Sequence, residues 1–180
     1  MVKCISKPSQ TRRLGSVTAS AVAIMATVGA AVGGVPAPAL AAIEGAVISN
    51  DLAPCKAGSG PALLVTVSGI KATSGKIRIQ TYRATKSEWM ESGKWINRIE
   101  TAATGPTMTF CLPVPAPDTY GVAVRHDING NGKTDITQDG GGISNNPSIN
   151  IFNLGKPSYT KVGVAVRDEV KAIRITMKYI

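Results

Sequence analysis

Residues 126–140, HDINGNGKTDITQDG, contain the side chains of this sequence that are best suited to bind an ion. Oxygen-bearing side chains recur at alternate positions from residue 127 onwards, and glycines between them allow the chain to turn sharply. Calcium takes about six to eight oxygen ligands, so a chain that curls around it needs short Asp or Asn side chains at this spacing. The candidate ligands are Asp127, Asn129, Asn131, the backbone carbonyl of Lys133, Asp135 and Asp139. The sequence therefore predicts Ca²⁺ as the bound cofactor.

The second half of this segment departs from the usual calcium-loop pattern. The twelfth position, where a bidentate Glu is usual, holds Gln138, and Asp139 follows one residue later. If Asp139 substitutes for that Glu, we expect an affinity on the order of 10⁻⁴ to 10⁻³ M, as in extracellular modules. The segment from Tyr120 to His126 alternates like a strand, which excludes a helix–loop–helix calcium site.

A plain turn is the alternative interpretation of the same segment. Asn-Gly steps form tight turns without any ion, because the Asn side chain hydrogen-bonds to nearby backbone. Two such steps occupy residues 129–132 and would suit a long hairpin loop. We favour calcium because Asp127, Asp135 and Asp139 would repel one another if they converged with no cation between them.

His126 is the single histidine of the chain and the candidate for an enzymatic role. It continues the apolar face of Tyr120, Val122 and Val124, which places it at the rim of the core, whereas Asp127 points to the opposite side. Adjacent residues of a strand are poor partners for acid–base catalysis, and one histidine cannot build a multi-histidine zinc site. No serine lies in a nucleophile-elbow pattern either. The sequence predicts a non-enzymatic protein, with an enzyme that uses His126 and Asp127 as the alternative.

The first 41 residues have the layout of a secretory signal peptide. Basic residues precede a stretch from residue 14 to residue 40 that carries no charge and is rich in Ala, Val and Gly. A small-x-small sequence at 39–41 supplies a cleavage site, so we expect a mature periplasmic or secreted chain that starts near Ala42. A permanent membrane anchor over residues 14–35 is the alternative, but that stretch is only weakly hydrophobic, and we expect no stable span after cleavage.

The charge of the expected mature chain is moderate. Removal of residues 1–41 takes four of the 20 Lys and Arg residues and none of the 11 Asp and Glu residues, which leaves a net charge of +5. The remaining basic residues are scattered along the sequence rather than clustered on one element. We therefore expect no nucleic-acid partner.

Two cysteines remain after the expected cleavage, because Cys4 lies in the removed segment. An exported chain with two cysteines most simply forms one disulfide, here between Cys55 and Cys111. Paired metal thiolates or a nucleophilic cysteine would need a C-x-x-C motif or additional histidines, which the sequence lacks.

Apolar and polar residues alternate in several short segments, which is typical of strands that are buried on one face. The expected strands lie within residues 63–68, 76–80, 108–112, 120–126, 162–166 and 173–179. The first two are expected to form a hairpin across a turn at 73–75. Gly and Pro separate the segments, so we predict an all-β domain over residues 62–180, preceded by an entry loop at 42–61. Its expected architecture is an antiparallel β-sandwich of about seven strands, immunoglobulin-like or transthyretin-like.

Residues 85–104 break this rhythm and contain both tryptophans. Ser87 is a suitable N-cap for a short helix that Gly93 would end. One interpretation is a crossover whose Trp rings cover an open end of the sandwich. The other is an aromatic platform in which Trp89 and Trp95 bind a sugar or an apolar ligand.

The segment from Asp118 to Asp135, DTYGVAVRHDINGNGKTD, resembles a bacterial family of small exported proteins, domain of unknown function 2141. Members of that family carry a similar core, G-x-Y-A-hydrophobic-x-hydrophobic-x-H-D-x-N-x-N-G-x-x-D. GISNN at 142–146 and GKPSY at 155–159 fit the same resemblance, which covers roughly residues 62–179. It implies an exported β-sandwich domain and no established activity. In this chain Asp118 replaces the first core Gly, and the stretch after Asp139 is a glycine run.

These observations together predict an exported, non-enzymatic β-sandwich module with a calcium-stabilised loop and a structural or binding role. The loop is expected to lie at one end of the sandwich with residues 144–146 and 157–159, where a protein or glycan partner could bind. The alternative functions are a carrier of an apolar or carbohydrate ligand through Trp89 and Trp95, and an enzyme.

Overall fold

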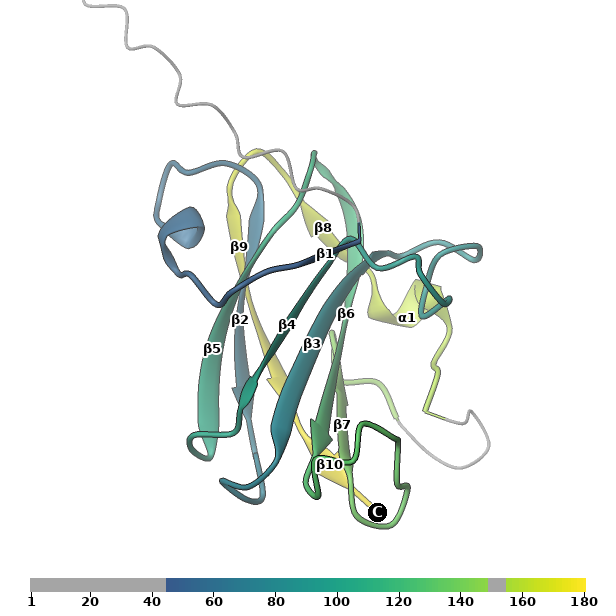
Figure 1. Ribbon diagram of the computed structural model, residues 1–180. Helices are drawn as coiled ribbons and strands as arrows, with labels where there is room; N and C mark the ends of the chain where they lie inside the picture. The colour runs from purple at the N-terminus through teal and green to yellow at the C-terminus, as the bar shows by residue number, and fades with distance from the viewer. Residues whose placement is uncertain (1–44, 149–154) are drawn as a thin grey trace, which may run out of the picture. The chain divides into compact units, whose positions relative to one another are not determined.

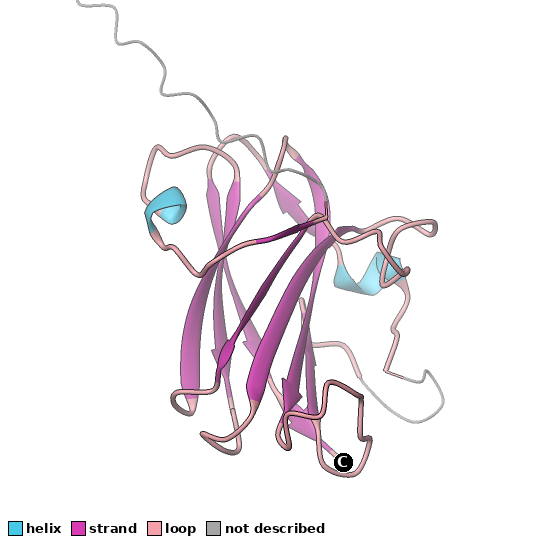
Figure 2. Cartoon of the chain, viewed as in Figure 1, coloured by secondary structure: helices cyan, strands magenta, loops and turns pink. Residues whose placement is uncertain are grey.

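The computed structural model describes residues 45–148 and 155–180. In this part of the chain, strands form two sheets that pack face to face around an apolar core (Figure 1). Figure 2 shows that strands dominate, with two short helical segments among the described residues, η1 (Ala53–Cys55) and α1 (Tyr159–Val162). The predicted all-β sandwich is therefore confirmed. The expected signal peptide, residues 1–41, lies outside the described residues, and no helix within them is long and apolar enough to cross a membrane.

The two sheets differ in size and are mostly antiparallel. The larger sheet follows the order β1-β4-β3-β6-β7-β10, with β8 also paired to β6. Its strands are β1 (Ala46–Val47), β3 (Lys76–Arg83), β4 (Asn97–Ala102), β6 (Asp118–Asp127), β7 (Gly140–Ile143), β8 (Val164–Val166) and β10 (Lys178–Tyr179). The smaller sheet has the order β5-β2-β9, formed by β5 (Thr107–Pro113), β2 (Ala62–Ser68) and β9 (Val170–Thr176). Only the pairs β1–β4 and β2–β9 are parallel among the described strands.

The core lies between the sheets and follows the alternation seen in the sequence. Leu63, Val65 and Val67 of β2 are fully buried, and they pack in one cluster with Ile77 and Ile79 of β3. Successive residues of a strand point to opposite faces, so every second residue reaches this cluster. Full burial of such a side chain contributes about 1.5–3 kcal/mol to the free energy of unfolding.

The hairpin expected between residues 63–68 and 76–80 does not form. β2 pairs with β5 and β9, whereas β3 pairs with β4 and β6, so the two segments belong to opposite sheets. β2 and β3 each direct an apolar face to the same core. Because they lie in opposite sheets, these two apolar faces are buried between the sheets. The connection turns at Gly69 and Gly75, which have φ values of 76° and 74°. A side chain at Gly75 would also clash with the carbonyl oxygen of Asp127.

Besides the two-residue strand β1 within the predicted entry loop, two strands were missed by the sequence analysis, β4 within the irregular stretch and β7 in the glycine run. Glycine is a poor strand former, so a Gly-Gly-Gly sequence favours a loop. In β7, however, the missing side chains allow close packing. A Cβ at Gly142 would lie 2.7 Å from Cγ2 of Ile175, and a Cβ at Gly140 would clash with the ring of Tyr179. Glycine is therefore required where β7 approaches β9 and β10.

The helix expected after Ser87 does not form, and the stretch 84–96 folds into successive turns. Trp89 does not cover an open end of the sandwich. Its indole lies on the outer face of the larger sheet, where a Cβ at Gly121 would lie 2.5 Å from the ring. Tyr82 packs edge-on at 5.6 Å between centroids, and Val162 of α1 completes a second apolar cluster there.

The disulfide between Cys55 and Cys111 is present, as predicted. It joins the segment before β2 to β5 over a sequence separation of 56 residues. Closing a loop of that length stabilises the folded chain by about 4 kcal/mol on the chain-entropy model.

Asparagine side chains bind both outer edges of the smaller sheet. On β5, Asn50 Nδ2 donates to the carbonyl of Thr109 at 2.9 Å, and its Oδ1 accepts from the backbone N–H of Cys111 at 3.3 Å. On β9, Asn146 Nδ2 donates to the carbonyl of Arg174 at 3.1 Å, and its Oδ1 accepts from the N–H of Thr176 at 2.8 Å. Each carboxamide thus replaces one peptide unit of a neighbouring strand.

The close approach at β7 gives a prediction with a matched control. Gly142→Ala should lower the free energy of unfolding by about 1–3 kcal/mol, because the added methyl overpacks the contact with Ile175. Gly141→Ala should be close to neutral, since a Cβ there meets nothing within 4 Å. Urea denaturation of the two variants checks this difference, and equal stabilities would contradict the proposed packing constraint.

Candidate functional site

The loop between β6 and β7, residues 128–139, holds most of the predicted site residues. It extends from the end of the sandwich where β2 ends and β10 lies (Figure 1). Asp127 is the last residue of β6, and its carbonyl touches Gly75 of the β2–β3 connection. The loop is therefore anchored at both ends by strands of the larger sheet.

The first half of the loop is curled by hydrogen bonds from Asp and Asn side chains to backbone. Asp127 Oδ2 accepts from the N–H of Gly132 at 2.8 Å, and Asn129 Oδ1 accepts from the N–H of Asn131 at 3.0 Å. Asn131 Oδ1 accepts in the same way from the N–H of Lys133 at 2.7 Å. Such side-chain to backbone bonds stabilise tight turns without an ion, as the turn interpretation requires.

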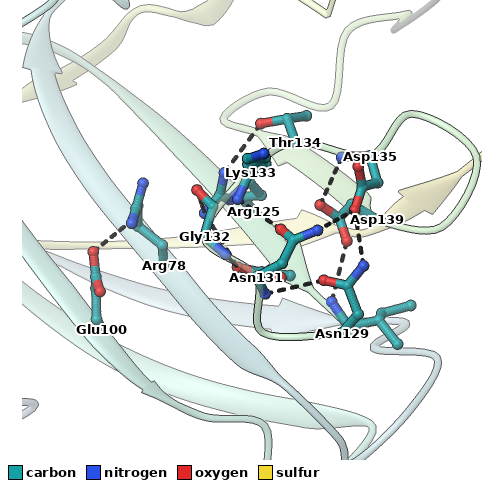
Figure 3. Close-up of polar contacts among 12 residues, drawn as sticks. Arg78, Glu100, Arg125, Asn129, Asn131, Gly132, Lys133, Thr134, Asp135 and Asp139 are labelled. Carbon is teal, nitrogen blue, oxygen red and sulfur yellow. Dashed lines mark hydrogen bonds and ion pairs between the residues drawn. The ribbon is translucent and has the colours of Figure 1, made fainter.

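Asp135 lies at the centre of this curl and is bound by both asparagines (Figure 3). Its Oδ2 accepts from Nδ2 of Asn129 at 2.8 Å and from Nδ2 of Asn131 at 2.7 Å. These two hydrogen bonds, that of Asn129 first, lower the pKa of Asp135 below its ordinary value of 3.8, and the charges of Lys133 and Arg125 act in the same direction. The carboxylate is thus stabilised by N–H donors of its own loop.

Asp139 closes the loop from its other end. Its side chain is buried, and both of its oxygens accept backbone N–H groups, from Ile128 at 3.1 Å and from Asp135 at 3.0 Å. These two hydrogen bonds connect Asp139 to Ile128 at the start of the loop and to Asp135 near its end. Asp139 therefore fixes the distance between the start and the end of the loop.

Asp127 is the most buried acid of the loop, with 3% of its surface exposed. Its Oδ2 forms an ion pair with Arg125 at 3.4 Å. Its Oδ1 is fully buried and has no hydrogen-bond partner within the described residues. Buried polar atoms normally have at least one hydrogen-bond partner, so this oxygen and Nε of Arg125, which is also buried without a partner among the described residues, are the two exceptions in the site.

Arg125 is a residue of this site that the sequence analysis missed. Besides its ion pair with Asp127, it donates to the hydroxyl of Thr134 at 3.1 Å and to the carbonyl of Gly132 at 3.2 Å. Its position two residues before Asp127 on β6 was the available signal, because alternate residues of a strand share a face. Arg125 supplies positive charge to a loop that otherwise collects acidic side chains.

The structure brings the predicted ligand side chains into one loop but does not gather their carboxylates. The described residues contain no group of three or more His, Cys, Asp or Glu side chains that could hold a metal. The repulsion that was expected among Asp127, Asp135 and Asp139 is reduced by amide and backbone N–H donors.

His126 is fully buried, with each ring nitrogen in a hydrogen bond. Nε2 lies 2.9 Å from the carbonyl of Ser74, which can only accept, so Nε2 carries the proton. Nδ1 lies at hydrogen-bond distance, 2.8 Å, from the hydroxyl of Tyr179, and that hydroxyl accepts from the N–H of Lys71. Burial raises the pKa of Tyr179, partly opposed by the Lys71 N–H. His126 thus ties β6 to the β2–β3 connection and to β10.

The tryptophans lie away from the loop, in the cluster on the outer face of the larger sheet. Trp89 has 2% of its surface exposed, and its Nε1 donates to the carbonyl of Pro157 at 2.8 Å. Trp95 is partly exposed and stacks with Arg98, 4.4 Å from the ring centroid. Because Trp89 packs against the first half of β6, residues 157–159 lie beside this cluster and not at the loop end, where they were expected.

The protein-family comparison identifies the chain by its sequence. A family model described as an uncharacterized protein conserved in bacteria, domain of unknown function 2141, matches residues 65–174. The chain belongs to this family. The resemblance noted from the Asp118–Asp135 segment is therefore confirmed. No match was found among curated proteins or among solved structures.

The match to domain of unknown function 2141 separates two groups of residues in this chain. It includes the loop, Arg125 and His126, together with the strands from β3 to β8. Cys55 precedes it and Tyr179 follows it, so the disulfide and the hydrogen bond to His126 each join a matched strand to a residue outside the match.

The hydrogen bonds to Asp135 predict a measurable pKa change. In an Asn131→Ala variant, the pKa of Asp135 should rise toward 3.8, because one N–H donor to the anion is lost. Because the folded-state pKa is depressed, the contribution of these bonds is present above about pH 3.8 and is lost as the pH falls through the folded-state pKa. A carboxyl NMR titration measures this, with Thr137→Ala in the same loop as the control. An unchanged pKa in Asn131→Ala would contradict the assignment.

Proposed function

We propose that the protein is an exported, non-enzymatic β-sandwich module, periplasmic or secreted, whose loop from Asp127 to Asp139 binds calcium. The ion would have a structural role, ordering the loop for contact with a protein or glycan partner. The loop, the β2–β3 connection and β10 meet at one end of the sandwich through Gly75 and the bonds of His126. Loops held in this way on a rigid scaffold are common binding surfaces.

The observation that carries the calcium proposal is the unpartnered Oδ1 of Asp127. A buried carboxylate oxygen without a donor costs about 1–3 kcal/mol or more, because its hydration is lost and not replaced. A cation at this atom removes that cost. The bond from Gly132 N–H to Oδ2 holds the same carboxylate against the Asn129–Asn131 turn, where the other oxygen side chains lie.

Calcium and the loop's own N–H groups compete for the same carboxylate. In the structure, Nδ2 of Asn129 and Nδ2 of Asn131 each donate a hydrogen bond to the carboxylate of Asp135. Binding would require these amides to rotate and present Oδ1 to the ion, beside Asp127, Asp135 and the carbonyl of Lys133. Asp139 would keep its backbone hydrogen bonds and hold the loop closed. This exchange is consistent with a weak site, with a dissociation constant on the order of 10⁻⁴ to 10⁻³ M.

Two further features support an exported, non-catalytic role. The disulfide between Cys55 and Cys111 is typical of proteins that fold in an oxidising compartment. Both nitrogens of His126 are engaged in bonds that join segments of the fold, and the ring is fully buried, which supports a structural role over a catalytic one. A histidine used in this way has a structural function.

A carrier of a carbohydrate or apolar ligand is the second candidate, and Trp95 is the observation that favours it. Its ring is partly exposed and already stacks with a cation, so a sugar face could pack on it in the same manner. Trp89 would support this platform from inside the cluster rather than touch the ligand, because it is buried. Quenching of the Trp95 fluorescence by a panel of glycans would distinguish this function from calcium binding.

Calcium should stabilise the folded chain by an amount that grows with the logarithm of its concentration above the dissociation constant. At roughly 10 mM calcium, the expected affinity gives an increase of about 1.4–2.7 kcal/mol in the free energy of unfolding, with a corresponding rise in Tm. Asp127→Asn should abolish this increase, because it removes one charge while an acceptor for Gly132 N–H remains. Thr137→Ala should keep it. Calorimetric titration and thermal denaturation measure the effect, and the absence of both heat and a thermal shift in the wild type would refute the proposal.

A further inference from the structure

The loop contains two Asn-Gly steps, Asn129-Gly130 and Asn131-Gly132, and all four residues are exposed. Glycine has no side chain to shield its backbone nitrogen, so this nitrogen can approach the side-chain carbonyl of the preceding Asn. Attack at that carbonyl is the first step of spontaneous asparagine deamidation. The sequence gives the two steps equal reactivity, but the structure does not.

The backbone nitrogen of Gly132 is restrained. Its N–H donates to Oδ2 of Asp127 at 2.8 Å, and Asp127 is itself buried and paired with Arg125. To attack Asn131, this nitrogen would have to break a hydrogen bond to a charged acceptor, which is one of the stronger kinds. Loss of its proton next to a carboxylate would also be unfavourable.

The backbone nitrogen of Gly130 is not restrained in this way. It makes no hydrogen bond with any described residue. Oδ1 of Asn129 accepts from the N–H of Asn131 at 3.0 Å, and this hydrogen bond polarises the carbonyl that would be attacked. Gly130 and Gly132 are alike in other respects. Their φ values are 70° and 79°, neither has an atom within 4 Å of a Cβ position, and Oδ1 of Asn131 also accepts a backbone N–H, from Lys133 at 2.7 Å. The hydrogen bond of the glycine nitrogen is therefore the difference between the two steps.

We propose that Asn129 is a site of spontaneous deamidation, in which the backbone nitrogen of Gly130 is the attacking atom. Asn131 is protected by the hydrogen bond from the N–H of Gly132 to Asp127. The nitrogen of Gly130 attacks Cγ of Asn129 and forms a new N–C bond. The Cγ–Nδ2 bond breaks, and the leaving amide takes up the proton from Gly130 as ammonia is released. Water then opens the cyclic imide at either carbonyl and gives Asp or iso-Asp at position 129, with no change of oxidation state.

The modification changes the charge balance of the loop. Nδ2 of Asn129 is a donor to Asp135 at 2.8 Å and to Gln138 at 3.2 Å, and both bonds are lost when it leaves. A carboxylate takes its place beside Asp135, which raises the pKa of Asp135 and destabilises the closed loop. If calcium binds as proposed above, the same carboxylate adds an anionic ligand and strengthens that binding. This last consequence rests on the proposed function, whereas the modification itself does not.

The test follows the full chain by peptide mass spectrometry at mildly alkaline pH and physiological temperature. Deamidation at Asn129 should be at least about tenfold faster than at Asn131, because the bond from Gly132 N–H to a charged acceptor protects by that factor or more. In the urea-denatured chain the two rates should be similar. Equal rates in the folded chain, or faster reaction at Asn131, would overturn the proposal.

Two variants separate the cause from general unfolding. Asp127→Asn weakens the hydrogen bond that the N–H of Gly132 donates to residue 127. It should increase the deamidation rate at Asn131, while the deamidation rate at Asn129 stays within about twofold of the wild-type rate. Arg125→Lys, which keeps the positive charge and leaves Asp127 in place, should retain the selectivity. Circular dichroism establishes that each variant is folded, and a rate at Asn131 that is unchanged in folded Asp127→Asn would overturn the proposed protection. The rate ratio in the absence of calcium does not depend on metal binding, so failure of the calcium proposal would leave it unchanged.

Discussion

The alternation of side chains along β6 is the constraint on which the rest of the structure depends. This strand pairs with β3, β7 and β8, and its alternate residues from Tyr120 to His126 are buried between the sheets. The intervening residues must then face outward, which places Arg125 and Asp127 side by side beneath the loop. The alternation of side chains along β6 therefore places His126 in the interior and Asp127 at the base of the candidate site.

Each acidic side chain of the loop has hydrogen-bond donors or a cationic partner within the protein. Backbone N–H groups bind Asp139, asparagine amides bind Asp135, and Arg125 pairs with Asp127. These donors and a divalent cation are alternative ways to stabilise the same charges, so the balance between them is set by small free energies. Within the described residues, Oδ1 of Asp127 and Nε of Arg125 are the buried atoms of this site that have no hydrogen-bond partner.

Sequence patterns predicted the elements in which the preference of the local sequence agrees with the contacts made to residues distant in the sequence. The sequence correctly predicted the alternating strands β2, β3, β5 and β6. It also predicted the disulfide between Cys55 and Cys111 and the family to which the chain belongs. The hairpin between β2 and β3 was wrong because alternation identifies a buried face but not the sheet that contains it. β7 was missed because its glycines are needed for close packing against Ile175 and Tyr179, which are distant from β7 in the sequence. Arg125 and the open Oδ1 of Asp127 depend on hydrogen-bond geometry that no residue spacing reveals.

The carboxamides of Asn50 and Asn146 have a consequence for the behaviour of the protein at high concentration. Each occupies one donor and one acceptor position on an outer edge of the smaller sheet. A strand from another molecule would have to displace that amide before it could extend the sheet. Exposed strand edges are common starting points of aggregation, so two short polar side chains give this small sheet a barrier against fibril growth.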